Sequence, residues 1–177
     1  MSRHDPRPPR RPTPPAEEPT RFASPVCYAD EADPTYFGAM DNAELIALLN
    51  TLLEAERAGA QVAAAWEREA AGDLRRLLGE VKRDEARFAA MLTRLVQRAG
   101  GEPSRATGAF REKALALEGP LPERLAFLNR GQGWVIRKLA EALPRIADDH
   151  AHAELKTMLD VHEANVARCD AAVGAAG

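Results

Sequence analysis

Apolar residues recur every three or four positions along most of the chain after residue 40, which is the period of an amphipathic helix. Breaks in this pattern separate four long helical segments, at about residues 41–70, 73–99, 122–146 and 148–173. No segment shows the strict alternation of a half-buried strand. The pattern therefore predicts an all-α protein.

The ends of these segments carry helix start and stop signals. Asp41 or Asn42 can cap the first helix, and the glycine pair at residues 100–101 ends the second. The connection that follows, residues 101–120, is long enough to cross the body and predicts a short helix near residues 108–117. We therefore expect an antiparallel four-helix bundle with a long crossover between its second and third helices.

One polar residue interrupts the apolar face of each long helix, near its middle. The four residues are Glu56, Glu85, Gln132 and His162. Antiparallel helices of similar length bring their midpoints to one level, so these side chains should converge in a single layer. An ionised carboxylate in an apolar core costs several kcal/mol unless a partner, a proton or a metal compensates. The layer therefore calls for a chemical explanation.

A bundle of this kind resembles the ferritin-like superfamily, in which two helices each give a Glu and two each give a Glu-x-x-His pair to a di-iron or di-manganese centre. The resemblance covers about residues 41–173. It extends to an uncharacterised bacterial branch of that superfamily through the stretches "LLEAERAGA", "RDEARFAAML", "PSRATGAF" and "LAFLNRGQGWVIRKL". It supports the fold more than any particular activity.

Matched to that pattern, three of the six expected metal ligands are present: Glu56, Glu85 and His162. Phe88 stands where a His is expected, Gln132 where a carboxylate is expected, and Leu159 where the Glu of the last pair is expected. Two dications about 3.5 to 4 Å apart need bridging carboxylates and an imidazole on each metal. The sequence therefore predicts neither a di-iron oxidase nor an iron-storage ferroxidase.

Two interpretations of the layer remain. In one, Glu56, Glu85 and His162 hold a single Fe, Mn or Zn ion, Gln132 or water completes the shell, and the protein is a mononuclear metal oxidoreductase. In the other, the protein has no cofactor, and His162 hydrogen-bonds the two carboxylates in a non-catalytic or vestigially metal-binding bundle. The sequence favours the second interpretation and leaves open whether the protein is an enzyme.

Composition narrows the range of partners. The 177 residues include 24 Lys and Arg against 27 Asp and Glu, a net charge of -3, so no basic field points to nucleic acid. No run approaches the ~20 apolar residues of a membrane span, and the Arg-rich start lacks the apolar stretch of a secretory signal. Two cysteines are too few for a disulfide framework. We expect a cytoplasmic protein that binds neither nucleic acid nor membrane.

The N-terminal part of the chain has a different composition. Residues 1–21 are rich in Pro and Arg and predict a disordered tail, whereas residues 22–40 contain four aromatic residues and predict an extended arm packed on a bundle of residues 41–174. Trp134 points away from Gln132 and lies beside Gly131 and Gly133, which allow close approach of another segment. The arm, or the second subunit of a homodimer, could cover this residue, with ordinary core packing as the alternative.

Overall fold

The computed structural model describes residues 38–174, and every regular element in that range is a helix. The elements are α1 (Asn42–Glu69), α2 (Gly72–Arg98), α3 (Phe110–Leu115), α4 (Leu121–Ala142), the 3₁₀ helix η3 (Leu143–Arg145) and α5 (Asp149–Gly174). The all-α prediction is confirmed. Within the described range, no helix has the length and apolar character needed to cross a membrane. The predicted tail, and the arm up to residue 37, lie outside the described residues.

Local chemistry explains where these helices begin and end. The Asp41 carboxylate accepts a hydrogen bond from the Glu44 amide at 2.7 Å, and the Glu44 side chain accepts one from the Asp41 amide, so the pair forms a capping box. Asp148 accepts from the Ala151 amide at the start of α5. The predicted third helix extends as α4 only to Ala142, and the last residues tighten into η3 because Pro144 has no N–H to continue an α-helix.

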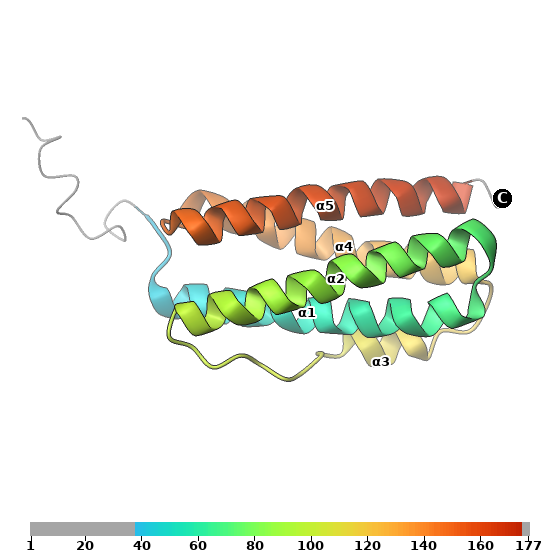
Figure 1. The fold of residues 1–177 in the computed structure, drawn as a ribbon, viewed down its shortest axis with the longest axis horizontal. Helices are drawn as coiled ribbons and strands as arrows, with labels where there is room; N and C mark the ends of the chain where they lie inside the picture. Colours follow the sequence, from blue (N-terminus) through green and yellow to red (C-terminus); the bar gives the residue numbers. More distant parts are fainter. Residues whose placement is uncertain (1–37, 175–177) are drawn as a thin grey trace, which may run out of the picture. The chain divides into compact units, whose positions relative to one another are not determined.

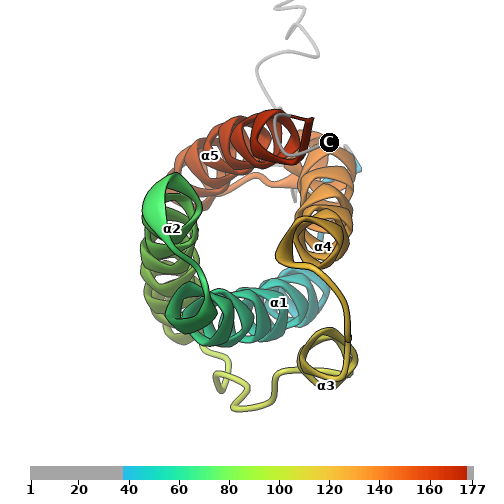
Figure 2. The ribbon, with the colours of Figure 1, turned by 90° about the vertical axis from the view of Figure 1, so that its right-hand side faces the viewer.

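The four long helices lie side by side around a shared interior (Figures 1 and 2). Helix α1 contacts α2 and α4, and helix α5 contacts the same two helices. Seen end-on, the order around the interior is α1, α2, α5, α4. Each long helix therefore has two long neighbours and turns one face inward, as its single apolar stripe predicts.

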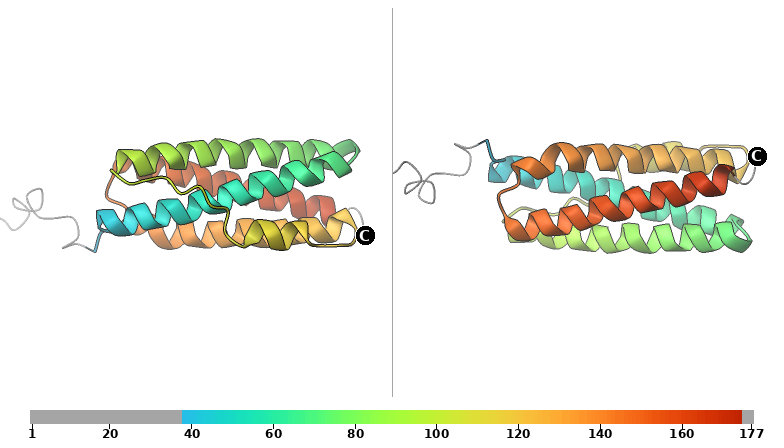
Figure 3. Two further views of the ribbon diagram at one scale, coloured as in Figure 1. Left: turned by 90° about the horizontal axis from the view of Figure 1, so that it is seen from below. Right: turned by 90° about the horizontal axis from the view of Figure 1, so that it is seen from above.

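The connection between α2 and α4 runs along the outside of α1 before it reaches α3 (Figure 3). Hydrogen bonds fasten it there: the Ser104 amide donates to Asn50 Oδ1 at 2.7 Å, and the Arg57 guanidinium donates to the Ser104 carbonyl. At its far end, α3 packs against α1 and α4. The predicted short helix within this connection is therefore present, as α3.

The close approach predicted from the glycines of α4 occurs at only one of them. A β-carbon at Gly131 would come within 2.7 Å of the Phe110 ring of α3. Gly133 has no such neighbour, because the nearest atom is in the Arg137 side chain of its own helix, 3.7 Å away. Trp134 is half-buried and packs against the hydrophobic core. The aromatic residues of the predicted arm lie outside the described residues, so its contact with Trp134 stays a prediction.

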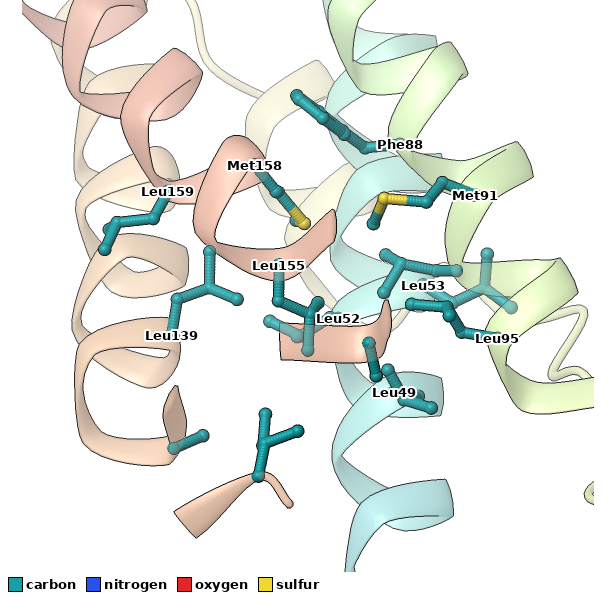
Figure 4. Close-up of a cluster of buried hydrophobic side chains, with 14 of the residues drawn as sticks. Leu49, Leu52, Leu53, Phe88, Met91, Leu95, Leu139, Leu155, Met158 and Leu159 are labelled. Atoms are coloured by element: carbon teal, nitrogen blue, oxygen red, sulfur yellow. The ribbon is translucent and has the colours of Figure 1, made fainter. Parts of the chain in front are cut away.

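The hydrophobic core consists of two clusters separated along every long helix. Cluster A, part of which is shown in Figure 4, contains buried residues 49–53 of α1, 88–96 of α2, 135–142 of α4 and 151–159 of α5. Cluster B contains buried residues 62–66 of α1, Ala70 directly after it, 78–81 of α2, Ala114 of α3, 125–128 of α4 and 169 of α5. In each helix the polar residue singled out in the sequence falls between the two clusters. A layer of polar side chains thus separates cluster A from cluster B near the middle of the long helices.

Candidate metal centre

All four polar residues predicted to face inward are buried. The side chains of Glu56, Glu85, Gln132 and His162 are each at most 3% exposed. Glu56, Glu85 and His162 offer potential ligand atoms that lie within 4.8 Å of one another. The structure therefore brings together three of the four side chains that were predicted to converge, and their role as metal ligands stays a prediction. Gln132 lines the same pocket as Glu85.

Hydrogen bonds hold the His162 ring in one orientation. Its Nδ1 lies 3.0 Å from the carbonyl oxygen of Met158, one helical turn earlier, and its Nε2 lies 3.1 Å from Glu56 Oε1. A carbonyl only accepts hydrogen bonds, so Nδ1 carries a proton and donates it. Nε2 and Glu56 must then share a further proton, or Nε2 must turn its lone pair to a cation. A carbonyl-bound Nδ1–H with a free Nε2 is the arrangement typical of metal-binding histidines.

The two carboxyl groups occupy an environment that disfavours their charges. Burial raises the pKa of Glu56 well above 4.5, a hydrogen bond with the Glu85 side chain lowers it, and the nearby Asp84 charge raises it. Burial also raises the pKa of Glu85, and the neighbouring Glu56 charge raises it further, while His162 opposes the rise. Glu56 Oε2 is buried without a hydrogen-bond partner. Without a compensating cation, the site therefore favours protonated carboxyl groups.

A glycine of α1 makes room for Glu85. A β-carbon at Gly59 would come within 2.3 Å of Glu85 Oε2 and within 2.6 Å of its carboxyl carbon. The carboxylate therefore lies against the α1 backbone, where any side chain would displace it. Gly59 was not among the site residues predicted from the sequence. The available signal was a glycine in a helix interior, three residues after Glu56, where it lowers helix propensity by about 1 kcal/mol.

A second polar group borders the site between α2 and α5 and was also missed. Asn165 is buried, and its amide nitrogen donates to Asp84 Oδ2 at 3.2 Å. The Arg168 guanidinium donates to Asn165 Oδ1 and to Glu80 of α2. These contacts orient Asp84, the residue before Glu85. The signal in the sequence was an amide three residues after His162, on the same helix face.

Two positions where a dinuclear centre would need ligands are filled by apolar side chains. Phe88 is 2% exposed, and its ring centroid lies 5.5 Å from that of His162. Leu159 is buried in cluster A. Neither side chain offers a metal-binding atom, so the carboxyl and imidazole groups that meet here are those of Glu56, Glu85 and His162.

A pocket of about 490 Å³ lies beside the layer, bordered by α1, α4 and the segment leading into α3. Its inner wall includes Gly59, Glu85 and Gln132, and its outer part includes Phe110 and Trp134. Neither the amide nitrogen nor the amide oxygen of Gln132 has a hydrogen-bond partner. The carboxyl group of Glu85 is thus reached from a cavity large enough for a small molecule.

Comparison with known proteins adds a family but no function. The family model described as "Domain of unknown function (DUF6306)" matches residues 43–171, which include the four long helices almost entirely. No curated protein and no solved structure matches the chain significantly.

Proposed function

We propose that this chain, which belongs to the DUF6306 family, is a ferritin-like four-helix bundle that binds one divalent transition-metal ion through Glu56, Glu85 and His162. The observation that carries the proposal is the convergence of three buried donor groups around a histidine whose Nδ1 is already occupied by a backbone carbonyl. Its Nε2, which lies 3.1 Å from Glu56 Oε1, would turn to the metal together with that carboxylate.

Charge and donor chemistry support an ion over a purely proton-linked network. A divalent cation would neutralise two buried carboxylates, which without it must take up protons or remain as buried charges. When both carboxyl groups are ionised, Glu56 Oε2 has no hydrogen-bond partner. Two carboxylates and an imidazole suit Fe, Mn or Zn, and the amide oxygen of Gln132 or a water molecule would complete the shell. The ion would supply Lewis-acid or redox chemistry.

The order and contacts of the helices support the ferritin-like assignment. Two pairs of sequence-adjacent helices, α1 with α2 and α4 with α5, are joined by one long connection that passes outside α1. Each long helix contributes one buried polar residue to the level between the two hydrophobic clusters. Bundles of the ferritin-like type combine one long crossover with inward-facing metal ligands.

Without an ion, the same residues form a metal-free layer in which His162 Nε2 and Glu56 Oε1 are joined by a hydrogen bond. This non-catalytic state is the form that a vestigial site would adopt. One observation favours activity instead: the pocket that reaches Glu85 would bring a small molecule to the edge of the layer. A mononuclear metal oxidoreductase is therefore the second candidate function.

Metal content tests the proposal directly. The full chain, purified without chelators and also reloaded with Mn²⁺, Fe²⁺ or Zn²⁺ after EDTA treatment, should hold about one ion per chain by elemental analysis. His162→Ala and Glu56→Gln should each abolish stoichiometric binding. His152→Ala and Glu163→Gln are matched controls, because both residues are exposed on α5, and these variants should bind like the unsubstituted chain. Equal loss of metal from controls and site variants, or no uptake by the unsubstituted chain, would contradict the proposal.

A further inference from the structure

We infer that the pocket between α1, α4 and α3 binds an organic carboxylate with an aromatic body and a hydroxyl group at its far end. The inference goes beyond metal binding and does not depend on it, because it rests on the lining of the pocket alone. The pocket's volume of about 490 Å³ falls in the range of about 300 to 1,000 Å³ that is typical of small-molecule sites.

The aromatic side chains that line the pocket indicate that the ligand has an aromatic body. Phe110 of α3 and Phe127 of α4 both line the pocket, and their rings stack with centroids 5.2 Å apart. The half-buried Trp134 ring lines it as well. Aromatic rings favour offset stacking or edge-to-face contacts with other rings. A flat aromatic body therefore fits this lining.

Two arginines at the rim of the pocket indicate that the ligand carries a carboxylate. Arg130 and Arg137 line the pocket and lie seven residues apart, about two turns along the same side of α4. Among residues 38–174, neither guanidinium has an acidic partner within 4.0 Å; that of Arg130 lies over the Phe127 ring at 5.1 Å. Two acids also line the pocket: Glu54 accepts a hydrogen bond from Ser104 Oγ, and Glu85 is buried at the inner wall. Free guanidinium groups bind carboxylates through paired hydrogen bonds.

Gln132 at the inner wall of the pocket indicates that the ligand carries a hydroxyl group at the end opposite its carboxylate. This side chain is 3% exposed, and both its amide nitrogen and its amide oxygen lack partners. A buried polar group without a partner costs about 1–3 kcal/mol, which a ligand can recover by pairing with it. A hydroxyl both donates and accepts, so it can pair with either end of the amide. An aromatic carboxylate that bears a hydroxyl opposite its acid group therefore satisfies both ends of the pocket.

The test uses 3-(4-hydroxyphenyl)propionate as the probe, with its neutral amide and 3-phenylpropionate for comparison. Calorimetry on the full chain in EDTA should show that the hydroxylated acid binds at least about tenfold more tightly than its amide. Arg130→Ala/Arg137→Ala should remove that preference. Arg75→Ala/Arg94→Ala, the matched control, should retain it, because both residues are exposed on α2 away from the pocket. Gln132→Leu should abolish the preference for the hydroxylated acid over 3-phenylpropionate.

Fluorescence locates the bound probe. The chain has two tryptophans, and Trp66 is buried in cluster B, so Trp66→Phe leaves Trp134 as the reporter. The hydroxylated acid should change Trp134 emission in this variant, and Ala55→Phe, which fills the pocket from α1, should abolish binding. If Trp66→Phe melts early, calorimetry with Ala55→Phe alone decides the location. Equal affinity for acid and amide, binding unaffected by Ala55→Phe, or no binding at millimolar probe would overturn the inference. Because the assays contain EDTA, these outcomes leave the metal proposal untouched.

Discussion

The Glu85 carboxylate lies against the backbone of Gly59, so closely that a β-carbon at position 59 would come within 2.3 Å of Glu85 Oε2. This contact crosses from α2 to α1, and it fixes where the carboxylate can sit in the buried layer. The glycine thus belongs to the site although it has no side chain to bind anything.

Gly59→Ala is expected to weaken metal binding, because the added methyl group pushes the Glu85 carboxylate away from Glu56 and His162. We expect the affinity for Mn²⁺ or Zn²⁺ to fall at least about tenfold, measured by calorimetry on EDTA-treated protein, which is the usual order of loss when a supporting contact is disturbed. Gly133→Ala is the control, because its β-carbon meets no atom closer than 3.7 Å. Unchanged affinity in Gly59→Ala would show that Glu85 is not a ligand.

His162→Leu should destabilise the metal-free protein strongly. It removes the partner of Glu56 and leaves two carboxyl groups buried in an apolar interior. The expected loss is about 3 to 5 kcal/mol of unfolding free energy, measured by urea denaturation in EDTA. Replacing Glu56, Glu85 and His162 together by leucine should restore most of this loss, because no buried charge remains. Additive costs across the single and triple variants would argue against a coupled layer.

Stability of the metal-free protein should fall as pH rises above about 4.5. The folded-state pKa of both Glu56 and Glu85 is raised, so between the ordinary value and the raised value the folded state holds protons that the unfolded state has lost. Unfolding free energies measured in EDTA across this range should therefore decrease with pH. Glu56→Gln/Glu85→Gln should flatten the profile in that window. A slope of opposite sign would show that the carboxylates are stabilised as anions.

Replacing Gly131 or Gly133 of α4 by alanine should change the stability of the protein in opposite directions. At Gly131 the β-carbon would clash with the Phe110 ring at 2.7 Å, so Gly131→Ala should destabilise the protein and displace α3. At Gly133 there is room, so Gly133→Ala should stabilise the protein by up to about 1 kcal/mol through helix propensity. Thermal melts of the two variants, with proteolysis near residue 110 as a probe of α3, test this difference. Similar shifts of the two melting temperatures would contradict it.

Cys169 should resist alkylation in the folded protein. Burial raises the pKa of its thiol from 9.0 to about 11, so the reactive thiolate is about a hundredfold rarer at neutral pH than in the unfolded chain. In Cys27→Ser, where Cys169 is the single cysteine, iodoacetamide labelling followed by mass spectrometry should be at least that much slower than in urea. Because the folded state disfavours the thiolate, Cys169 should also cost stability as pH rises above 9. Rapid labelling under native conditions would show that the α5 end opens readily.

The sequence predicted the helices and the inward direction of the four polar residues because both depend on spacing along one helix. Helical period alone places Glu56 and His162 on the apolar faces of their helices. It could not reveal the Gly59 contact or the pocket, because these depend on how neighbouring helices are rotated and spaced. The hydrogen bonds of Asn165 could not be predicted for the same reason. The predicted covering of Trp134 by the arm stays a prediction.

The layer takes half of its members from each helical hairpin: Glu56 and Glu85 come from α1 and α2, whereas Gln132 and His162 come from α4 and α5. Each hairpin can form from contacts that are local in sequence, but the layer exists only after the two hairpins dock in the correct register. A shift of one helical turn would place a carboxylate against leucines of cluster A or cluster B, at the cost of burying it without a partner. The polar residues therefore favour the correct docking register of the two hairpins during folding. An ion bound between them would hold the two hairpins together.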